Sequence, residues 1–434
     1  MRRSVVAALA VLAAGAAALL PAPAASAHVV PSTVIALDVH DSDITATVTL
    51  PESDLATASG VDVGDVLDDS EAAALEAYLE DHFAVASDDG AWTVDATAVE
   101  LGSTEQWGTG AFDTVTATVL LTPADASEVR AFTLEYDAIV HQVVTADVSV
   151  ILHSDWAAGE LESARDLGTI SADTVTGGVS PLAIDLDDGS WWQGFAGMLG
   201  LGVSHIAKGT DHQLFLLTLL LPAPLLAAGG RWRRTAPTRT AVRRIAAITL
   251  AFTIGHSITL ALGALGLAVA QQPVEVLIAA SILVAAVHAI RPLFPGREVV
   301  VAGSFGLVHG MAFSATLAAL DLSGGQLALS LAGFNLGIEL MQLVVVVVVL
   351  PPLVVLAGTR AYAPLRVGAA AAAVAAAAGW LLDRAGVPNL VGAAADAIGP
   401  ASPWIAGALW VAALGVLARR AVAPSPADRG FAHS

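Results

Sequence analysis

Polar and ionisable residues interrupt the apolar C-terminal half of this 434-residue chain at six places. Each place lies within or at the end of a stretch that is long and apolar enough to cross a bilayer. Ionisable groups at membrane depth are costly, and they usually line a path for ions or protons. Imidazole, carboxylate and amide groups also bind first-row divalent metals. The six places are residues 205–212, 256–257, 275, 288, 306–310 and 335–342.

We expect the costliest of these side chains to converge on one cation near the membrane midplane. Each is unfavourable alone in hydrocarbon, whereas a shared ion offsets several such penalties. Cysteine is absent, so a metal site must use nitrogen and oxygen ligands. The predicted ligands are His205, Asp211, His212, His256, His309 and Glu339. The predicted supporting residues are Asn335, Gln342 and Glu275, while His288, next to Arg291, is expected to be interfacial.

The spacing of these residues sets requirements on the helices. In a continuous helix His205 and His212 would lie about 10 Å apart along the axis, and Asp211 and His212 would point about 100° apart. A break at Gly209 would let them converge, as in the broken helices that line polar cavities of transporters. Further along, Asn335, Glu339 and Gln342 are spaced i, i+4 and i+7, which places them on one helical face.

Composition and charge predict a polytopic α-helical membrane protein with about seven spans. The hydrophobic fraction is 56% and the mean hydropathy is +0.71, above the average for soluble proteins. Arginines concentrate in alternate loops, which places the C-terminus in the cytoplasm and the N-terminal domain outside the plasma membrane. The predicted spans are residues 194–228, 245–269, 274–290, 299–320, 326–350, 367–383 and 403–418.

The N-terminal part is predicted to be exported. Residues 1–27 resemble a signal peptide that ends in an Ala-Ser-Ala cleavage site. Short runs rich in β-branched residues predict a β-rich, sandwich-like extracytoplasmic domain, with a helix over residues 70–85 capped by Ser70. The predicted organisation is a signal peptide (1–27), extracytoplasmic domain (28–156), linker (157–190), membrane domain (191–420) and disordered tail (421–434).

The exported part also offers a candidate copper site. Cleavage after Ala27 would leave His28 as the amino terminus, and a terminal amine with its own imidazole suits Cu²⁺. His141 and His153, on two late strands, could complete that site, whereas His40 and His82 look like ordinary positions. Residues 28–190 carry 32 Asp and Glu against two arginines, a net charge of −30, which could attract cations or serve solubility.

Four motifs in the membrane half resemble those of the HupE/UreJ family. They are His205-x5-Asp211-His212, His256-Ser257-x-Thr259, Phe305 to Phe313 around His309, and Phe334-Asn335-x-Gly337-x-Glu339-x-x-Gln342. The resemblance covers about residues 191–350, and it is similar in particular to the longer branch of that family, which has an exported N-terminal domain. It implies a nickel permease or an accessory protein of hydrogenase and urease maturation. A histidine-rich metal-gathering stretch is absent, which leaves the metal open among Ni, Co, Zn and Cu.

Three functions remain open from the sequence. The first is a secondary transporter or permease for a divalent transition metal, since the chain has no nucleotide-binding loop. The second is an intramembrane zinc-dependent hydrolase of the lipid amidase type, in which three ligands leave a fourth position for water. The third is a copper-binding surface protein with a membrane anchor. The expected partners are a metal ion and the lipid bilayer, with no nucleic acid, and the oligomeric state is open.

Overall fold

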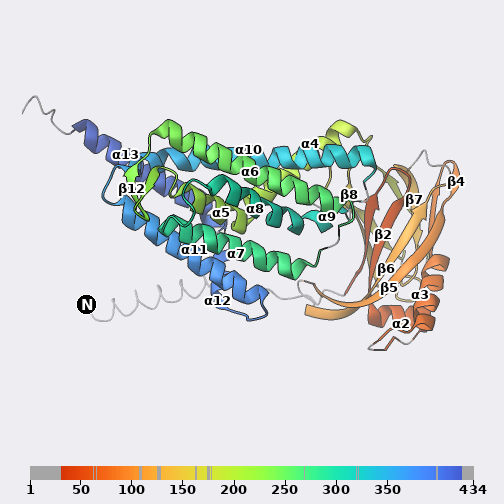
Figure 1. The fold of residues 1–434 in the computed structure, drawn as a ribbon. Helices are drawn as coiled ribbons and strands as arrows, with labels where there is room; N and C mark the ends of the chain where they lie inside the picture. Colours follow the sequence, from red (N-terminus) through yellow and green to blue (C-terminus); the bar gives the residue numbers. More distant parts are fainter. Residues whose placement is uncertain are drawn as a thin grey trace, which may run out of the picture. The chain divides into compact units, whose positions relative to one another are not determined.

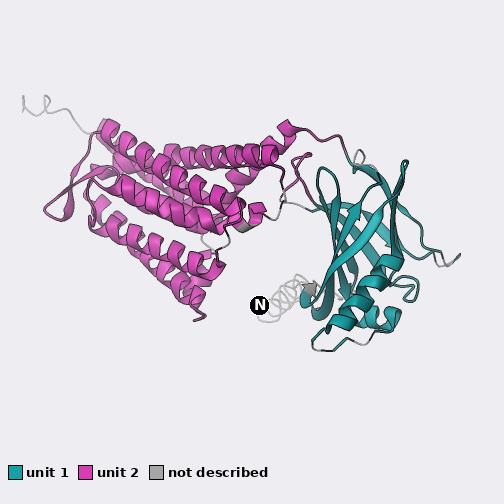
Figure 2. Ribbon diagram, turned by 45° about the vertical axis from the view of Figure 1, so that its right-hand side comes forward, with its two compact units in different colours: residues 1–153, 164–186 teal, residues 154–163, 187–434 magenta. Residues whose placement is uncertain are grey.

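A computed structural model describes residues 31–422 of the chain, with gaps at residues 62, 65, 107–109, 125–128, 162–163, 174–175, 177, 268, 319, 321 and 397–398. The chain divides into two units (Figure 2). Unit 1 contains the chain up to His153 and Ala164–Leu186, and unit 2 contains Ser154–Ser163 and the remainder. The predicted signal peptide, His28 and residues 423–434 of the predicted tail lie outside the described residues.

Unit 1 contains two sheets that share one core. The first has the strand order β5-β6-β2-β1-β8-β9 and the second β10-β7-β3-β4. Burial alternates along β1 and β2, as it must when one face of a strand meets a core. Ile35 and Leu37 from the first sheet and Leu134 and Tyr136 from the second belong to the same buried cluster. The predicted β-rich N-terminal region is therefore confirmed.

The strands of unit 1 have these bounds: β1 Thr33–Val39, β2 Ile44–Pro51, β3 Phe83–Ser87, β4 Gly90–Ala91, β5 Thr93–Gln106, β6 Gly110–Thr122, β7 Ala131–Tyr136, β8 Asp147–Asp155, β9 Arg165–Ser171 and β10 Leu182–Asp185. Two helices, α2 Glu52–Ser59 and α3 Asp69–His82, complete it.

The predicted helix over residues 70–85 differs at both ends from α3. Its N-cap is Asp68 rather than Ser70, because the Asp68 carboxylate accepts from the backbone of Ser70 and Glu71 in a capping box. A carboxylate at this position also interacts favourably with the helix dipole. The helix stops at His82 because Phe83 and Val85 alternate into the core as strand β3.

Part of the segment predicted as a linker, residues 157–190, forms strands. β9 pairs with β8 at the edge of the first sheet, and β10 pairs with β7 at the edge of the second. Each strand buries few side chains, chiefly Ile170 and Ile184. Their apolar pattern is therefore too sparse to predict a strand from sequence, and pairing with longer neighbours supplies the missing stability.

Unit 2 is mainly helical (Figure 1). Five of its described helices are long and apolar enough to cross a membrane. These coincide with five of the seven predicted spans. The other two are interrupted: residues 194–228 divide into α4, α5 and the first strand of a hairpin, and residues 299–320 into a 15-residue apolar helix and a short one. The elements are α4 Trp191–Lys208, α5 Thr210–Leu220, β11 Leu225–Ala228, β12 Arg231–Thr235, α6 Thr238–Ala264, α7 Gln271–Ile290, α8 Glu298–Ala312, α9 Ser314–Ala318, α10 Gly324–Ala357, α11 Tyr362–Arg384, α12 Leu390–Asp396 and α13 Ser402–Val422.

Glycines allow two helix pairs in unit 2 to pack backbone against backbone. In the α6–α8 pair, a Cβ at Gly306 would overlap the carbonyl oxygen of Phe252, and one at Gly310 would overlap that of His256. In the α4–α10 pair, a Cβ at Gly337 would overlap the carbonyl oxygen of Leu199. Small residues at such crossings permit the close approach typical of helices packed in membranes.

The glycine contacts predict that a glycine-to-alanine substitution lowers the stability of unit 2 by an amount that depends on its position. Gly306→Ala should destabilise unit 2 by about 1–3 kcal/mol, since the α6–α8 pair must separate to admit the Cβ. Gly200→Ala is the matched control, because Gly200 lies on α4 with no atom within 4 Å of a new Cβ. Thermal unfolding in detergent measures both. Equal midpoints for the two variants would contradict the close packing.

Candidate metal centre

The predicted helix break at Gly209 is present. α4 ends at Lys208 and α5 begins at Thr210, with Gly209 in an extended conformation between them (φ −69°, ψ 99°). The break brings the imidazole rings of His205 and His212 to 4.5 Å between centroids. A continuous helix would hold them about 10 Å apart along its axis.

Four helices converge at this break and bring together two groups of metal-binding side chains. His256 on α6 joins His205 and His212 in one group, and His309 on α8 joins Asp211 and His212 in another. Within each group, one ligand atom from each residue lies within 4.8 Å of the others. His212 belongs to both groups. The structure therefore brings together five of the six predicted ligands.

Hydrogen bonds define which nitrogen of His309 carries a lone pair. The Ser281 hydroxyl donates to the carbonyl oxygen of Ile278 at 2.7 Å, so it accepts from Nε2 of His309 at 2.9 Å. Nδ1 of His309 is then the unprotonated nitrogen of a neutral ring. His212 has the opposite arrangement, since its Nδ1 donates to the Asp211 carboxylate at 2.9 Å and its Nε2 keeps the lone pair.

Several of the imidazole nitrogens in this cluster are buried without a hydrogen bond. Among the described residues, Nε2 of His205, Nε2 of His212, Nδ1 of His309 and both nitrogens of His256 have no partner of normal geometry. The Asn335 side chain interacts with the His256 ring, but its Oδ1 is itself buried without a hydrogen bond. A buried polar atom left unsatisfied costs about 1–3 kcal/mol. Coordination of a metal ion would satisfy the lone pairs of these rings, so the donor set fits a transition metal.

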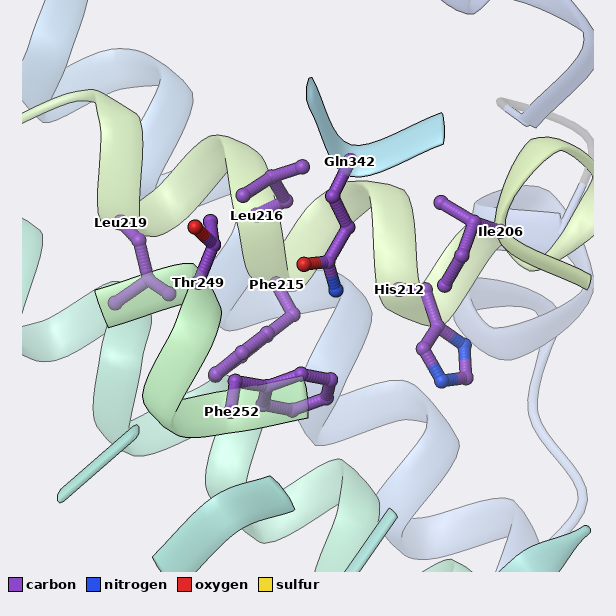
Figure 3. A pocket seen from close by; sticks show the side chains of 8 residues that line it. All are labelled: Ile206, His212, Phe215, Leu216, Leu219, Thr249, Phe252 and Gln342. Atoms are coloured by element: carbon purple, nitrogen blue, oxygen red, sulfur yellow. The ribbon is translucent and has the colours of Figure 1, made fainter. Parts of the chain in front are cut away.

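Glu339, the sixth predicted ligand, is not in either group. Thr253 on α6 donates to its carboxylate at 2.8 Å and lies 3.4 Å from Oε1 of Gln342. Thr253 is about one helical turn before His256 on α6. Glu339 and Gln342 of α10 therefore lie about one turn of α6 away from the His256 imidazole. Gln342 and His212 line the same pocket, with apolar residues of α5 and α6 around them (Figure 3).

Glu275 and His288 lie outside the cluster. Glu275 is about half exposed and pairs with Arg384 at 3.3 Å, so the predicted supporting role near the ligands does not match its surroundings. His288 stacks on Phe294 at 3.9 Å and accepts from the backbone of Leu293. It belongs to a separate polar region in which Arg244 pairs with Glu298.

Sequence reasoning missed Ser281 as the partner of His309 and Thr253 as the partner of Glu339. Ser281 is nevertheless visible as a polar residue within the apolar run of α7. Aromatic rings also surround the imidazoles. The ring centroids of Phe313 and Phe334 lie 4.9 and 5.4 Å from that of His205, and the centroid of Phe252 lies 5.2 Å from that of His309. This apolar surround strengthens electrostatic interactions with any ion held between the rings.

In unit 1 the two described histidines of the candidate copper site have separate partners. His153 pairs with Asp38 at 2.7 Å, whereas His141 stacks on His82 at 4.4 Å between centroids and forms a third group with His82 and Asp137. His28 lies outside the described residues. From the sequence, His82 is expected to be an ordinary position without a ligand role, whereas the structure places it in a group that could hold a metal ion.

Comparison with protein-family models matches part of the chain. Residues 183–384 match a family model described as HupE / UreJ protein. The matched segment contains the five clustered residues of α4, α5, α6 and α8, and also Glu339 and Gln342 of α10. No curated protein and no solved structure matches the chain.

The shared position of His212 predicts an unequal series of variants. His212→Ala removes a ligand from both groups, so it should weaken divalent metal binding to unit 2 by at least about 100-fold. His205→Ala and His309→Ala each leave one group intact and should cost less. Equilibrium dialysis of the full-length protein with Ni²⁺, Co²⁺ or Zn²⁺ measures the affinities. His288→Gln is the control, and equal losses in all four variants would contradict the shared ligand.

Proposed function

Because residues 183–384 of this chain belong to the HupE/UreJ family, we propose that the protein is a permease for a divalent transition-metal ion. The observation that carries the proposal is the pair of three-residue groups that share His212. Both are formed by apolar helices, and several of their imidazole nitrogens are buried without a hydrogen bond. Such groups at membrane depth typically mark an ion path.

The ligand chemistry supports a divalent ion of the nickel, cobalt, zinc or copper type. Neutral imidazoles and one carboxylate suit these borderline ions, whereas Mg²⁺ and Ca²⁺ prefer oxygen ligands. With Asp211 ionised, the five clustered side chains carry one negative charge against two on the ion. Glu339, joined to α6 through Thr253, supplies a second carboxylate one helical step away.

The overlap of the two groups supports movement of the ion rather than permanent binding. An ion held by His205, His212 and His256 can exchange two ligands for Asp211 and His309 while it remains bound to His212. Stepwise exchange avoids release of a bare cation into an apolar environment, which would be very costly. The cargo's gradient, the membrane potential or protons would drive a transporter of this secondary type.

The proposed membrane arrangement has seven crossings, with α4 and α5 forming one and α8 and α9 another. Three arginine-bearing helix ends lie at one end of unit 2: Arg244 pairs with Glu298, Arg366 donates to the carbonyl oxygen of Ile290 at 3.1 Å, and Arg420 lies beside Gly358. Arg384, at the far end of α11, pairs with Glu275 instead. We place the end with the three arginines in the cytoplasm. Unit 1 is then extracytoplasmic in a multi-pass plasma-membrane protein.

One observation favours the hydrolase as a second candidate. His205, His212 and His256 form a three-histidine group of the kind that leaves a fourth zinc position for water. However, His256 is 0% exposed and His212 7% exposed, and Nε2 of His205 is buried, so the ligand nitrogens are closed to a lipid amide in this conformation. An ion needs much less space, which is why the permease is the primary proposal.

Ion flux tests the permease directly. Proteoliposomes loaded with a metal-sensing dye should show uptake of at least one of Ni²⁺, Co²⁺, Zn²⁺ and Cu²⁺. His212→Ala should abolish flux because both groups lose a ligand, and Glu339→Gln should reduce it because one carboxylate is lost. His288→Gln should retain most of the flux. Wild-type flux no greater than that of His212→Ala, for all four ions, would reject the permease and favour the hydrolase.

The orientation is tested with single cysteines, because the chain has none. Thr235→Cys lies at the exposed end of β12 on the arginine-rich side, and Gly324→Cys lies at the start of α10 with no atom within 4 Å of a new Cβ. In intact cells an impermeant thiol reagent should label position 324 and spare position 235. The reverse pattern would invert the proposed topology.

A further inference from the structure

Unit 1 contains a third cluster of metal-binding side chains, formed by His82, Asp137 and His141. One ligand atom from each lies within 4.8 Å of the others. We propose that this cluster is a second metal site of the protein, which binds a divalent transition-metal ion in the β-rich unit. The site shares no residue with the cluster in unit 2, so this proposal does not depend on the proposed transport function.

Backbone pairing places the three side chains together. His82 is the last residue of α3 and precedes Phe83, which pairs with Tyr136 in the β3–β7 ladder. The ladder continues by one bond, since the Asp137 amide donates to the carbonyl oxygen of His82 at 3.1 Å. One turn later, the His141 amide donates to the carbonyl oxygen of Asp137 at 3.0 Å. The cluster is thus fixed by main-chain geometry.

Both imidazoles direct Nδ1 toward Asp137. Nδ1 of His141 is 2.8 Å from the carbonyl oxygen of Asp137, and a carbonyl oxygen only accepts, so this nitrogen carries the proton. Nδ1 of His82 is 2.6 Å from Oδ1 of Asp137, and an ionised carboxylate likewise only accepts. In the neutral rings Nε2 therefore carries the lone pair. A histidine whose other nitrogen donates to a carboxylate or carbonyl is the usual arrangement of a metal ligand.

The separation of the rings is close to that of a metal site. The His82 and His141 rings stack with centroids 4.4 Å apart and an interplanar angle of 9°. Two nitrogens bound to one ion at about 2.0–2.1 Å lie roughly 3.3 Å apart in tetrahedral geometry. One ligand atom from each of the three residues lies within 4.8 Å of the others, so a movement of one side chain is needed to bring the ligand nitrogens to one ion. The exposed side chain of His141 can supply this by rotation, while His82 is held against Tyr78 at 4.5 Å.

The surroundings of the cluster favour a cation. It opens into a pocket that is also lined by Asp81, Glu135 and the segment from Gly178 to Pro181. The described lining contains three carboxylates and neither lysine nor arginine. Partial exposure leaves room for water to complete the coordination of the ion. The net charge of −30 over residues 28–190 adds long-range attraction.

The test uses the full-length protein in detergent with Zn²⁺ and Cu²⁺ as probes. His82→Ala and His141→Ala should each lower the number of bound ions by one per chain relative to wild type. His153→Ala is the matched control, since His153 is an exposed histidine of the same unit that pairs with Asp38 instead. Asp137→Asn keeps an acceptor for Nδ1 but loses the charge, and should weaken binding by about 10-fold. Retention of the ion by His82→Ala or His141→Ala would overturn the site.

A second readout needs no substitution at the site. Zn²⁺ should protect His82 and His141 from carbethoxylation, measured by mass spectrometry of peptides, while His153 should react equally with and without the ion. Equal modification of His82 and His141 with and without Zn²⁺ would also overturn the proposal. Protection that persists in His212→Ala would show that this site does not depend on the cluster in unit 2.

Discussion

The arrangement of unit 2 depends on the cost of imidazole groups buried among apolar helices. An imidazole has two polar nitrogens, and a helix backbone satisfies neither of them. In this structure Asp211 and Ser281 satisfy one nitrogen each on His212 and His309. The remaining imidazole nitrogens are buried without a hydrogen bond among aromatic rings, where a cation can interact with several imidazoles at once. The helix break at Gly209 and the glycine crossings serve this one requirement.

The sequence was informative wherever the physical reason was local. A histidine or aspartate in an apolar run is costly at its own position, so His205, Asp211, His212, His256 and His309 could be identified without knowledge of the fold. The break at Gly209 followed from the same argument, because two histidines seven residues apart cannot share an ion on a straight helix. Five of the spans likewise coincide with continuous apolar helices.

Features that depend on pairing between distant segments could not be predicted in this way. His82 and Asp137 are 55 residues apart, and only the β3–β7 register makes them neighbours. The strands within residues 157–190 are edge strands whose own apolar pattern is weak. The place of Glu339 depends on the rotation of α10 against α6, which spacing within α10 does not determine. In each case the neighbours of the residue come from a distant segment of the chain, so they could not be predicted from the local sequence.

The glycine crossings have a mechanical consequence for the cluster. Close backbone contact at the glycines couples α4 to α10 as one body and α6 to α8 as another, with little room for either pair to slide. His256 and His309 must therefore move together, and His205 must move with α10. Gly209 separates α5, with Asp211 and His212, from α4. A tilt of one body against the other would lengthen the distance from His205 to His256, whereas the distance from His256 to His309 would stay constant. His212, which belongs to both ligand groups, lies just after the break at Gly209, so the shared ligand lies where the two bodies can move apart.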